Sequence, residues 1–510
     1  MARFVTREGR VIQAYRYALD PSPRQQRALA SHAGAARVAY NWAVAWVLAT
    51  WAQRKAEESY GVPEGERTPW RSWSLPALRK EWNQVKDNVA PWWAENSKEA
   101  YSSGLAGAAA AFGNYAASRN GRRKGPPVGC PRRKTKHRSV RSCRFTTGPI
   151  GVESDRHHVT LPRLGAIRTH ESTRKLARRL EDGRARILAA TVRQEACGRW
   201  YVSLQAEVVR AAESPSRPGV AAGVDLGVSH LAVVADSAGG VRFQPNPQHL
   251  EQALSTLRRR SRQMARRRGP VGCDPATGAK VRQVPSAGWR EARRSLARAH
   301  VRVRHLRADA IAKLTSALAA EYGRVVAEDL NVAGMLRNRR LARRIAGAGF
   351  GEIRRQLGYK SAWNGGQLVL ADRWYPSSKT CSGCGVVKAK LPLRTRVFRC
   401  EACGLVLDRD LNAARNLAAL AASMAGAPEW PGPGRVSAEY ACGADRKTRR
   451  DDPGPAGAGG PAAMKQEPGI PHGSKTRTGT RQLVPAGACA HQGSLIRNGV
   501  TLAGPAVLSK

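Results

Sequence analysis

The clearest candidate for metal chemistry in this sequence is a set of four cysteines arranged in two pairs. Cys381-Ser-Gly-Cys384 and Cys400-Glu-Ala-Cys403 are separated by fifteen residues. Two such knuckles can place four thiolates at the corners of a tetrahedron, the usual geometry of structural Zn²⁺. Gly385 and Gly404 follow the knuckles and permit the tight turns that such a site needs. We predict a zinc ribbon whose fully coordinated ion supports structure. Four buried free cysteines and a thioredoxin-like redox motif are the alternatives.

Three carboxylates occupy positions that suit divalent ions and phosphodiester chemistry. Asp225 ends an apolar run that begins at Val220, Glu328 ends another, and Asp410 begins a helical segment soon after the cysteines. Taken singly, they suit a hairpin turn, a strand end and a helix N-cap. Taken together, they suit two ions about 4 Å apart that clamp the attacking and leaving oxygens of a phosphodiester. We predict that all three are catalytic metal ligands, with Mg²⁺ or Mn²⁺ as the cofactor.

The charge of the chain indicates what such a site would act on. Lys and Arg number 86 against 38 Asp and Glu, which gives a net charge of +48 and a pI near 11.2. A phosphate backbone neutralises such a surplus, so nucleic acid is the expected partner, and a generically solvated basic surface is the alternative.

The same composition argues against a membrane or secreted protein. No apolar run approaches the roughly 20 residues of a membrane span, and the first residues do not resemble a signal peptide. Six of the ten cysteines are scattered without a pairing pattern. We therefore expect a cytoplasmic protein with reduced thiols and no membrane partner.

The first part of the chain combines one extended run with a helical segment. Residues 11–19 look extended, and Ser22-Pro-Arg-Gln25 is a capping box with proline at the first helical position. This start predicts a helix to about Ala56. Eight of the thirteen tryptophans lie between Trp42 and Trp93. We interpret them as a buried aromatic core, with base stacking as the alternative.

The middle of the chain changes from helical to strand-like patterns. A basic linker is expected at residues 121–134, and a second linker rich in Pro and Ser at 214–219. Several short strands with Gly and Asp turns between the linkers suggest a small β-barrel. The expected strands are residues 150–153, 158–161, 165–169, 187–194 and 200–208.

From Val220 to about Ala422 the pattern is α/β. A basic helical stretch between the first two acids includes the arginine runs 258–260 and 266–268. Such runs are usually solvated faces, but their place beside the proposed site favours contact with nucleic acid. Beyond Ala425 the chain is rich in Gly and Pro with few large apolar residues, so we expect it to be mostly disordered.

These residues together resemble the TnpB (OrfB) proteins of bacterial insertion sequences, relatives of the type V CRISPR effectors. The resemblance covers about residues 10 to 420, and the order of its last motifs around the zinc knuckles is highly specific. The motifs are Tyr15-Arg-Tyr-Ala-Leu19, Ala39-Tyr-Asn-Trp42, Asn96-Ser-Lys-Glu-Ala-Tyr101, Gly223-Val-Asp-Leu-Gly227, Glu328-Asp-Leu-Asn331, Tyr375-Pro-Ser-Ser-Lys-Thr-Cys381 and Asp408-Arg-Asp-Leu-Asn-Ala-Ala-Arg-Asn416.

The resemblance implies a multidomain α/β fold. A wedge-like β-barrel is interrupted by a helical recognition lobe and followed by an RNase-H-like RuvC nuclease domain that carries the inserted zinc ribbon. The implied parts are the barrel at 1–20 and 126–215, the lobe at 21–125, the RuvC-like domain at 220–374 and 406–424, the ribbon at 375–405 and the tail at 425–510.

The resemblance also implies an activity. Family members are guided by an RNA from their own transposon end and cleave DNA beside a short motif. A guide RNA and target double-stranded DNA are therefore the implied partners. By position, Asp225, Glu328 and Asp410 take the catalytic roles. Asp408 is a neighbouring candidate, and Asp410 is preferred because it matches the second Asp of the family's Asp-Arg-Asp motif.

The sequence departs from the family pattern in two places and leaves two other functions open. Gly129–Lys134 has Cys and Arg where relatives usually carry aromatic residues, and the tail is poorly matched. A transposase that joins DNA strands is one alternative, although no His-hydrophobic-His pair with a tyrosine nucleophile is found. A non-catalytic zinc-ribbon regulator that binds nucleic acid is the other, and the intact acids argue against it. A plain DNA nuclease would show the same charge and acids, so RNA dependence rests on the resemblance alone.

Overall fold

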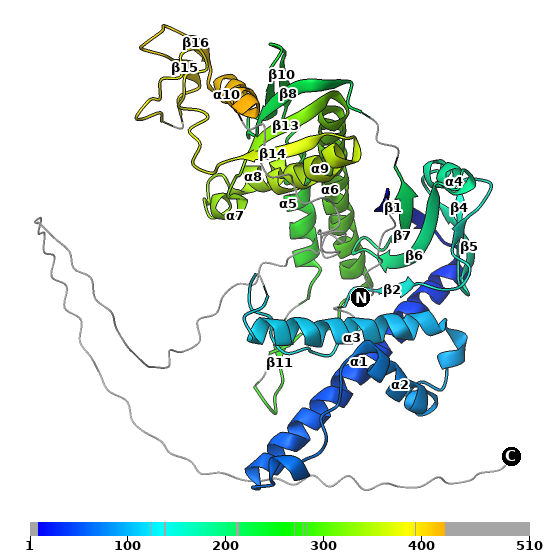
Figure 1. Ribbon diagram of the computed structural model, residues 1–510. Helices are drawn as coiled ribbons and strands as arrows, with labels where there is room; N and C mark the ends of the chain where they lie inside the picture. The colour runs from blue at the N-terminus through cyan, green and yellow to red at the C-terminus, as the bar shows by residue number, and fades with distance from the viewer. Residues whose placement is uncertain are drawn as a thin grey trace, which may run out of the picture. The chain divides into compact units, whose positions relative to one another are not determined.

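The computed structural model of the chain contains two large β-sheets, one before residue 210 and one after residue 214 (Figure 1). It describes residues 9–123, 125–136, 139–210, 214–269, 271–278, 280–282, 284–392 and 394–423. The tail predicted to be mostly disordered, residues 425–510, lies outside these ranges. Among the described helices, none combines the length and the apolar character needed to cross a membrane.

The first sheet is antiparallel throughout, with the strand order β2-β6-β7-β1-β5-β4-β3. All five strands predicted between residues 150 and 208 are confirmed with small shifts at their ends, whereas β2 and the helix α4 were not predicted. Strands β2 and β3 are the edges in this order, so closure into a barrel stays a prediction. The elements are β1 Arg10–Asp20, β2 Ser142–Phe145, β3 Gly151–Val152, β4 His158–Leu161, β5 Gly165–Thr169, α4 Arg174–Glu181, β6 Ala185–Gln194 and β7 Trp200–Val209.

Three helices follow β1 before the chain returns to the sheet. The predicted start of α1 is confirmed, because the Ser22 hydroxyl accepts from the Gln25 N–H at 3.3 Å and Gln25 Oε1 accepts from the Ser22 N–H at 3.0 Å. This reciprocal pair satisfies two N–H groups that a helix start leaves unpaired, and Pro23 has none to satisfy. The helices are α1 Pro23–Ser59, α2 Leu75–Val89 and α3 Lys98–Arg119.

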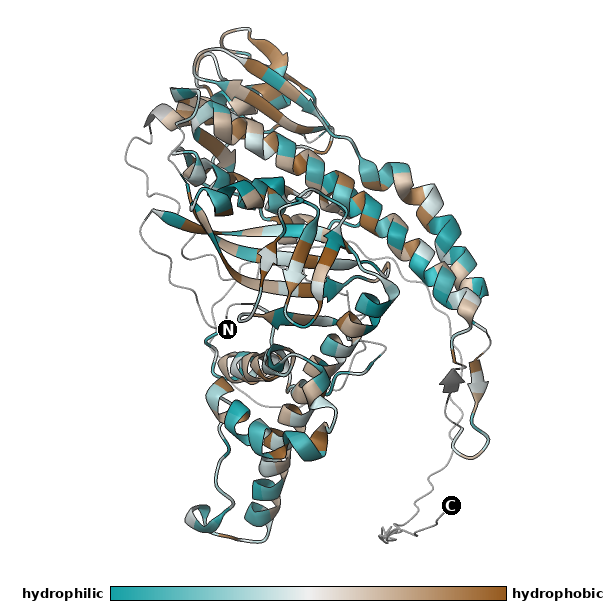
Figure 2. Cartoon of the chain, turned by 90° about the vertical axis from the view of Figure 1, so that its right-hand side faces the viewer, coloured by the Kyte–Doolittle hydropathy of each residue, from teal (hydrophilic) through white to brown (hydrophobic). Residues whose placement is uncertain are grey.

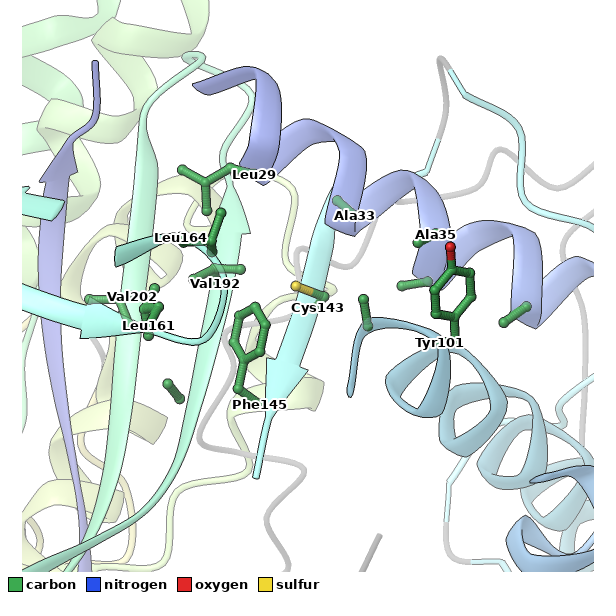
Figure 3. Packing of buried hydrophobic residues seen from close by; sticks show 14 of the residues in the cluster. Leu29, Ala33, Ala35, Tyr101, Cys143, Phe145, Leu161, Leu164, Val192 and Val202 are labelled. Atoms are coloured by element: carbon green, nitrogen blue, oxygen red, sulfur yellow. The ribbon is translucent and has the colours of Figure 1, made fainter. Parts of the chain in front are cut away.

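The helices and the first sheet share one hydrophobic core, in which side chains from α1, α3, β2 and β6 meet (Figure 3). The predicted aromatic core is confirmed in part. Trp82 is 4% exposed and packs edge-on against Trp42, with 5.3 Å between ring centroids. Trp70 and Trp92 are 61% and 47% exposed, so the core does not absorb every tryptophan of this region.

The basic linker predicted at residues 121–134 is fixed to α1 at its end. The Lys134 N–H donates to Asn41 Oδ1 at 2.7 Å, and Asn41 Nδ2 donates to Lys134 O at 2.9 Å. The Lys134 ammonium also lies 3.6 Å from the centroid of the Tyr40 ring. The family motif around Asn41 therefore has a structural role that the sequence alone did not suggest.

The second sheet has the strand order β10-β9-β8-β13-β14, in which β8, β13 and β14 are parallel and the other pairs antiparallel. The linker predicted at 214–219 is wrong at its end, because β8 begins at Arg217. Pro218 indicated a turn, but Arg217 and Ala221 on either side of it pair with β13. The two backbones lie so close that a Cβ on Gly323 would be 2.0 Å from Pro218 O. The strands are β8 Arg217–Asp225, β9 His230–Asp236, β10 Val241–Pro245, β13 Tyr322–Glu328 and β14 Gln367–Ala371.

Helices cover both faces of the second sheet, which gives three layers (Figure 1). On one face, Leu314 of α6 and Leu357 of α9 share a buried cluster with Val325 of β13. On the other face, Leu417 of α10 packs with Val326 of the same strand. The helices are α5 His249–Arg266, α6 Ala287–Glu321, α7 Val332–Met335, α8 Ala342–Ala348, α9 Phe350–Trp363 and α10 Arg409–Ser423.

The basic stretch between the first two acids forms the helices α5 and α6, joined by a short hairpin of β11 Val271–Cys273 and β12 Lys280–Arg282. The helices are confirmed, and the hairpin was not predicted. The arginines of both runs, 258–260 and 266–268, are exposed or half-exposed. Figure 2 shows mostly hydrophilic residues along these helices. Their contact with nucleic acid stays a prediction.

Candidate metal sites

The four cysteine sulfurs of the two knuckles gather at one point. The Sγ atoms of Cys381 and Cys403 are 3.6 Å apart, and so are those of Cys384 and Cys400. All four ligand atoms lie within 4.8 Å of one another. Since Zn–S bonds of about 2.3 Å give a tetrahedron with edges of about 3.8 Å, the sulfurs fit one tetrahedral ion.

Local backbone geometry explains how the knuckles bring these sulfurs together. Gly385 and Gly404 have φ angles of +78° and +73°, a region that side chains disfavour, so the predicted glycine turns are confirmed. The second knuckle lies between two short paired strands, β15 Val397–Arg399 and β16 Val406–Asp408. Cys381 is 1% exposed and Cys400 is 7% exposed. The cluster is therefore formed by residues close in sequence.

The first two acids stand side by side at the carboxyl ends of parallel strands. Asp225 is the last residue of β8 and Glu328 the last of β13, as predicted. Val224 is paired with Ala327, so the next residues of the two strands are neighbours. Neighbouring parallel strands place both carboxylates at the same edge of the sheet.

The alternation of side chains along a strand decides which face these acids share. A Cβ on Gly223 would lie 2.1 Å from Ala414 O, so this face of β8 contacts the backbone of α10 directly. Val326 of β13 packs on the same helix. Asp225 and Glu328 each lie two residues further along their strands. Both acids therefore project on the α10 side.

The third acid lies at the start of α10, close to the first two. Asp408 Oδ1 accepts from the N–H groups of Asp410 and Leu411 at 2.9 and 3.0 Å. The N-cap role considered for Asp410 therefore belongs to Asp408, which leaves the Asp410 carboxylate in the first turn for another use. A Cβ on Gly227, in the turn after β8, would lie 3.9 Å from Asp410 Oδ2. The fold thus brings together three acids that are far apart in sequence.

The electrostatics of this edge centre on Asp225. Burial raises the pKa of the Asp225 carboxyl well above its usual range, and the charges of Glu328 and Asp410 raise it further. Arg409 acts in the opposite direction but does not offset these effects. Like charges crowded at a partly buried site without a compensating cation disfavour the ionised form. The raised pKa of Asp225 is therefore the result of burial and of two like charges beside it.

Two of the acids have protein partners as well. The Ser377 hydroxyl donates to Glu328 Oε1, and Arg396 lies 3.7 Å from Asp410 Oδ2. The oxygens of the three acids are not as close together as the sulfurs, since the cysteines are the only group with ligand atoms all within 4.8 Å in the described ranges. Carboxylate oxygens are nevertheless the donors that Mg²⁺ and Mn²⁺ prefer, so the donor set fits such ions.

Sequence reasoning missed three residues that surround this edge: Gly223, Ser377 and Asn416. Gly223 and Ser377 lie within motifs that were identified, but neither residue carries a charge or a metal-ligand spacing. Asn412 and Asn416 are four residues apart in α10, which places both on one face of the helix, and Asp408 stands four residues before Asn412. That spacing is the signal that would have found the asparagines.

Three family models match the chain, and the two that lie after residue 200 contain every predicted acid and cysteine. They are described as "Helix-turn-helix domain" over residues 11–56, "Probable transposase" over residues 202–339 and "Cas12f1-like, TNB domain" over residues 350–417. The first range contains β1 and one continuous helix, α1, rather than two helices.

Two named relatives cover more than four fifths of the chain, and a third covers a shorter part. A protein of Mycobacterium tuberculosis named "Putative RNA-guided DNA endonuclease" is 41% identical over 500 residues, which cover 94% of this chain and 99% of the relative. A Streptomyces pristinaespiralis protein of the same name is 32% identical, and the match covers 82% of this chain and 91% of that protein. A "TnpB-like protein" of Acanthamoeba polyphaga mimivirus is 29% identical over 24% of this chain. The chain belongs to the TnpB/OrfB family. The assignment to the TnpB/OrfB family rests on a match to the Mycobacterium tuberculosis protein that extends over 94% of this chain, not on a single motif.

Proposed function

We propose that the chain is a transposon-associated, RNA-guided DNA endonuclease that hydrolyses phosphodiester bonds with divalent ions held by Asp225, Glu328 and Asp410. The observation that carries the proposal is the convergence of these three carboxylates at one sheet edge. The net charge of +48 supports a polyanionic substrate. The names of the relatives support a guide RNA and a double-stranded DNA target as partners. The proposal includes a cytoplasmic, nucleoid-associated location in a bacterial cell.

The proposed nuclease domain is RNase-H-like, of the RuvC type. A central sheet with antiparallel and parallel strands, covered on both faces by helices, is consistent with that fold. In such a domain the carboxyl ends of β8 and β13 and the first turn of α10 would form the catalytic edge. The first sheet and α1 to α3 would be the wedge-like barrel and the recognition lobe.

The chemistry follows from what these side chains can hold. Bound Mg²⁺ or Mn²⁺ would supply a Lewis acid for the phosphodiester and an activated water as the nucleophile. Asp225 must lose its proton before it can act as a ligand, because its pKa is raised in the metal-free chain. Glu328 and Asp410 would complete an oxygen-only donor set, and the basic surface would neutralise the backbone phosphates.

The proposed role of the cysteines is structural. Cys381, Cys384, Cys400 and Cys403 would hold Zn²⁺ with all four positions filled by protein, which leaves no open position for chemistry. Metal analysis of the purified chain should therefore find one zinc per molecule that survives dialysis against magnesium.

The proposal is tested with the full chain expressed beside its own transposon end. RNA that copurifies is sequenced, and cleavage is assayed on double-stranded DNA complementary to that RNA next to a randomised flank. Asp225→Ala should reduce cleavage by about 10³-fold or more, since a metal ligand contributes several kcal/mol to the transition state. Binding of RNA and DNA should be unchanged. Asp309→Ala is the matched control, because Asp309 is an exposed acid on α6 paired with Lys313.

Each part of the proposal has its own contradicting result. Undiminished cutting by the Asp225 variant would remove the catalytic assignment. DNA cutting without any copurified RNA would show that cleavage does not depend on a guide RNA. Joined transposon ends produced by this protein alone would favour a transposase, a description that one matching family model carries. Inactivity with guide, target and Mg²⁺ all present would favour a regulator.

A further inference from the structure

A buried serine beside the zinc knuckles touches one of the three acids. Ser377 is 3% exposed, and its hydroxyl donates to Glu328 Oε1. Ser377 lies six residues after Ala371, the end of β14, and four residues before Cys381. The segment from β14 to the first knuckle therefore passes directly over the acid edge of the sheet.

Two buried asparagines of α10 hold this segment in place. Asn416 Nδ2 donates to Ser377 O and to Thr380 O, each at 2.7 Å. Asn412 Nδ2 donates to Thr380 O at 2.7 Å, and its Oδ1 accepts from the Ser382 N–H at 2.9 Å. Asn416 is 5% exposed and Asn412 is 0% exposed. Because α10 also carries Asp410, one helix sets the position of an acid and of the serine that contacts another acid.

We propose that Ser377 is a positioning residue for Glu328, and that Asn416 fixes Ser377 for this purpose. The inference rests on the proposed function, because it concerns the divalent ions that Glu328 would hold. The Ser377 hydroxyl occupies one lone pair of Oε1 and leaves Oε2 and the other lone pairs of the carboxylate for a metal ion. It therefore orients the ligand without displacing the ion.

The energetic reason is the freedom that an unrestrained glutamate would keep. Glu328 ends its strand and is only half-buried, so packing alone does not select one orientation of its carboxylate. A hydrogen bond from a buried, backbone-fixed hydroxyl makes that selection before the ion arrives. Partners of this kind typically change metal affinity by about 10- to 100-fold when they are removed.

The neighbouring serine offers a matched control. Ser378 is half-buried in the same turn, and among the described residues its hydroxyl has no hydrogen-bond partner. Replacement of either serine by alanine removes one hydroxyl group from the same turn. Only the change at Ser377 removes a contact with an acid.

The test measures Mn²⁺ binding to the zinc-loaded full chain by paramagnetic resonance of free Mn²⁺, without guide or DNA. The part of the Mn²⁺ binding that Asp225→Ala abolishes is assigned to the site at the three acids. Ser377→Ala should weaken this binding about 10- to 100-fold. Ser378→Ala should bind as the wild type does, and Ser377→Thr should restore affinity because it keeps the hydroxyl.

The outcomes separate the inference from the function on which it rests. Equal Mn²⁺ affinity in Ser377→Ala and wild type would overturn the positioning role while leaving the acid site intact. Equal Mn²⁺ binding by wild type and Asp225→Ala would instead show that the three acids do not form a metal site. Asn416→Leu provides the second variant, and it should weaken Mn²⁺ binding in the same direction while zinc content stays at one per chain. Unchanged affinity in that variant would overturn the part assigned to Asn416.

Discussion

At one end of the second sheet Asp236 is surrounded by donors, whereas at the other end Asp225 is surrounded by acids. Asp236 Oδ2 accepts from Arg217 at 2.7 Å and from the Tyr322 hydroxyl at 3.2 Å, and its Oδ1 accepts from two backbone N–H groups. Burial alone would raise the pKa of Asp236, but the hydrogen bonds from Gly240 and Arg217 hold it below its usual value.

The contrast between the two ends separates an acid that is neutralised within the fold from the acids that we propose to bind metal. Both carboxylates belong to the paired strands β8 and β9. At the amino end of β8 the acid is neutralised within the protein and stabilises the fold. At the carboxyl end the fold holds three acids together at a cost in stability, which a bound cation would recover. Strain of this kind is a more specific sign of function than acid residues alone.

Among changes that leave the three acids in place, the largest expected effect comes from moving α10 away from the acid end. Gly223→Ala places a methyl group 2.1 Å from Ala414 O and 2.4 Å from Ala418 N, backbone atoms that cannot turn aside. The helix must shift, and Asp410 shifts with it. Cleavage should fall by about 100-fold or more, because a misplacement near 1 Å has effects of that size.

The control for this prediction lies in the same strand. Gly219→Ala meets nothing within 4 Å, so it should cut as the wild type does. Single-turnover cleavage by both variants, with guide and target held constant, checks the prediction. Equal rates for the two variants would show that the contact between β8 and α10 does not set the position of the acids.

How much of this site the sequence could predict depends on the distance over which its residues interact. The zinc knuckles were predictable because both turns and all four ligands are local. The strand ends at Asp225 and Glu328 were predictable because the apolar runs stop there. Gly223 and Ser377 were not, because their roles arise from contacts with a helix and a strand far away in the chain.

The fold shows the same division between local and distant effects. The capping box at Ser22 was predicted from four residues and is confirmed. The start of β8 at Arg217 was missed, because Pro218 and Gly219 favour a turn locally. Only the pairing of Arg217 and Ala221 with β13 extends the strand across them. Either Asp408 or Asp410 could cap α10 by sequence, and only the hydrogen bonds that Asp408 accepts from the Asp410 and Leu411 N–H groups identify it as the N-cap.

A smaller effect is expected in the pH dependence of the metal-free protein. The folded-state pKa of Asp225 is raised, so this group contributes stability that is fully present below about pH 3.9 and is lost as pH rises through the folded pKa. The pKa of Asp236, at the other end of the sheet, is lowered, so Asp236 contributes stability that is lost as pH falls through its folded pKa.

Denaturant unfolding of the zinc-loaded chain, in buffer free of other divalent ions, measures this dependence. The gain in stability from Asp225→Asn over wild type should be largest near neutral pH and should shrink as pH falls towards 4. A gain that does not vary with pH would mean that the ionised Asp225 carboxylate is not the source of the strain.

The central claim is that the acid end is a cation site, and thermal unfolding of Asp225→Asn and Asp236→Asn tests it most directly. With Zn²⁺ bound and no other divalent ion present, Asp225→Asn should melt above wild type, by about 2 to 4 °C for each kcal/mol of repulsion removed. Asp236→Asn should melt below it, because charge-assisted hydrogen bonds contribute about 1.5 to 3 kcal/mol. Mn²⁺ should raise the melting temperature of wild type and of Asp236→Asn but not of Asp225→Asn. If Asp225→Asn melts below wild type before Mn²⁺ is added, and Mn²⁺ stabilises all three proteins equally, the acid end is not a cation site.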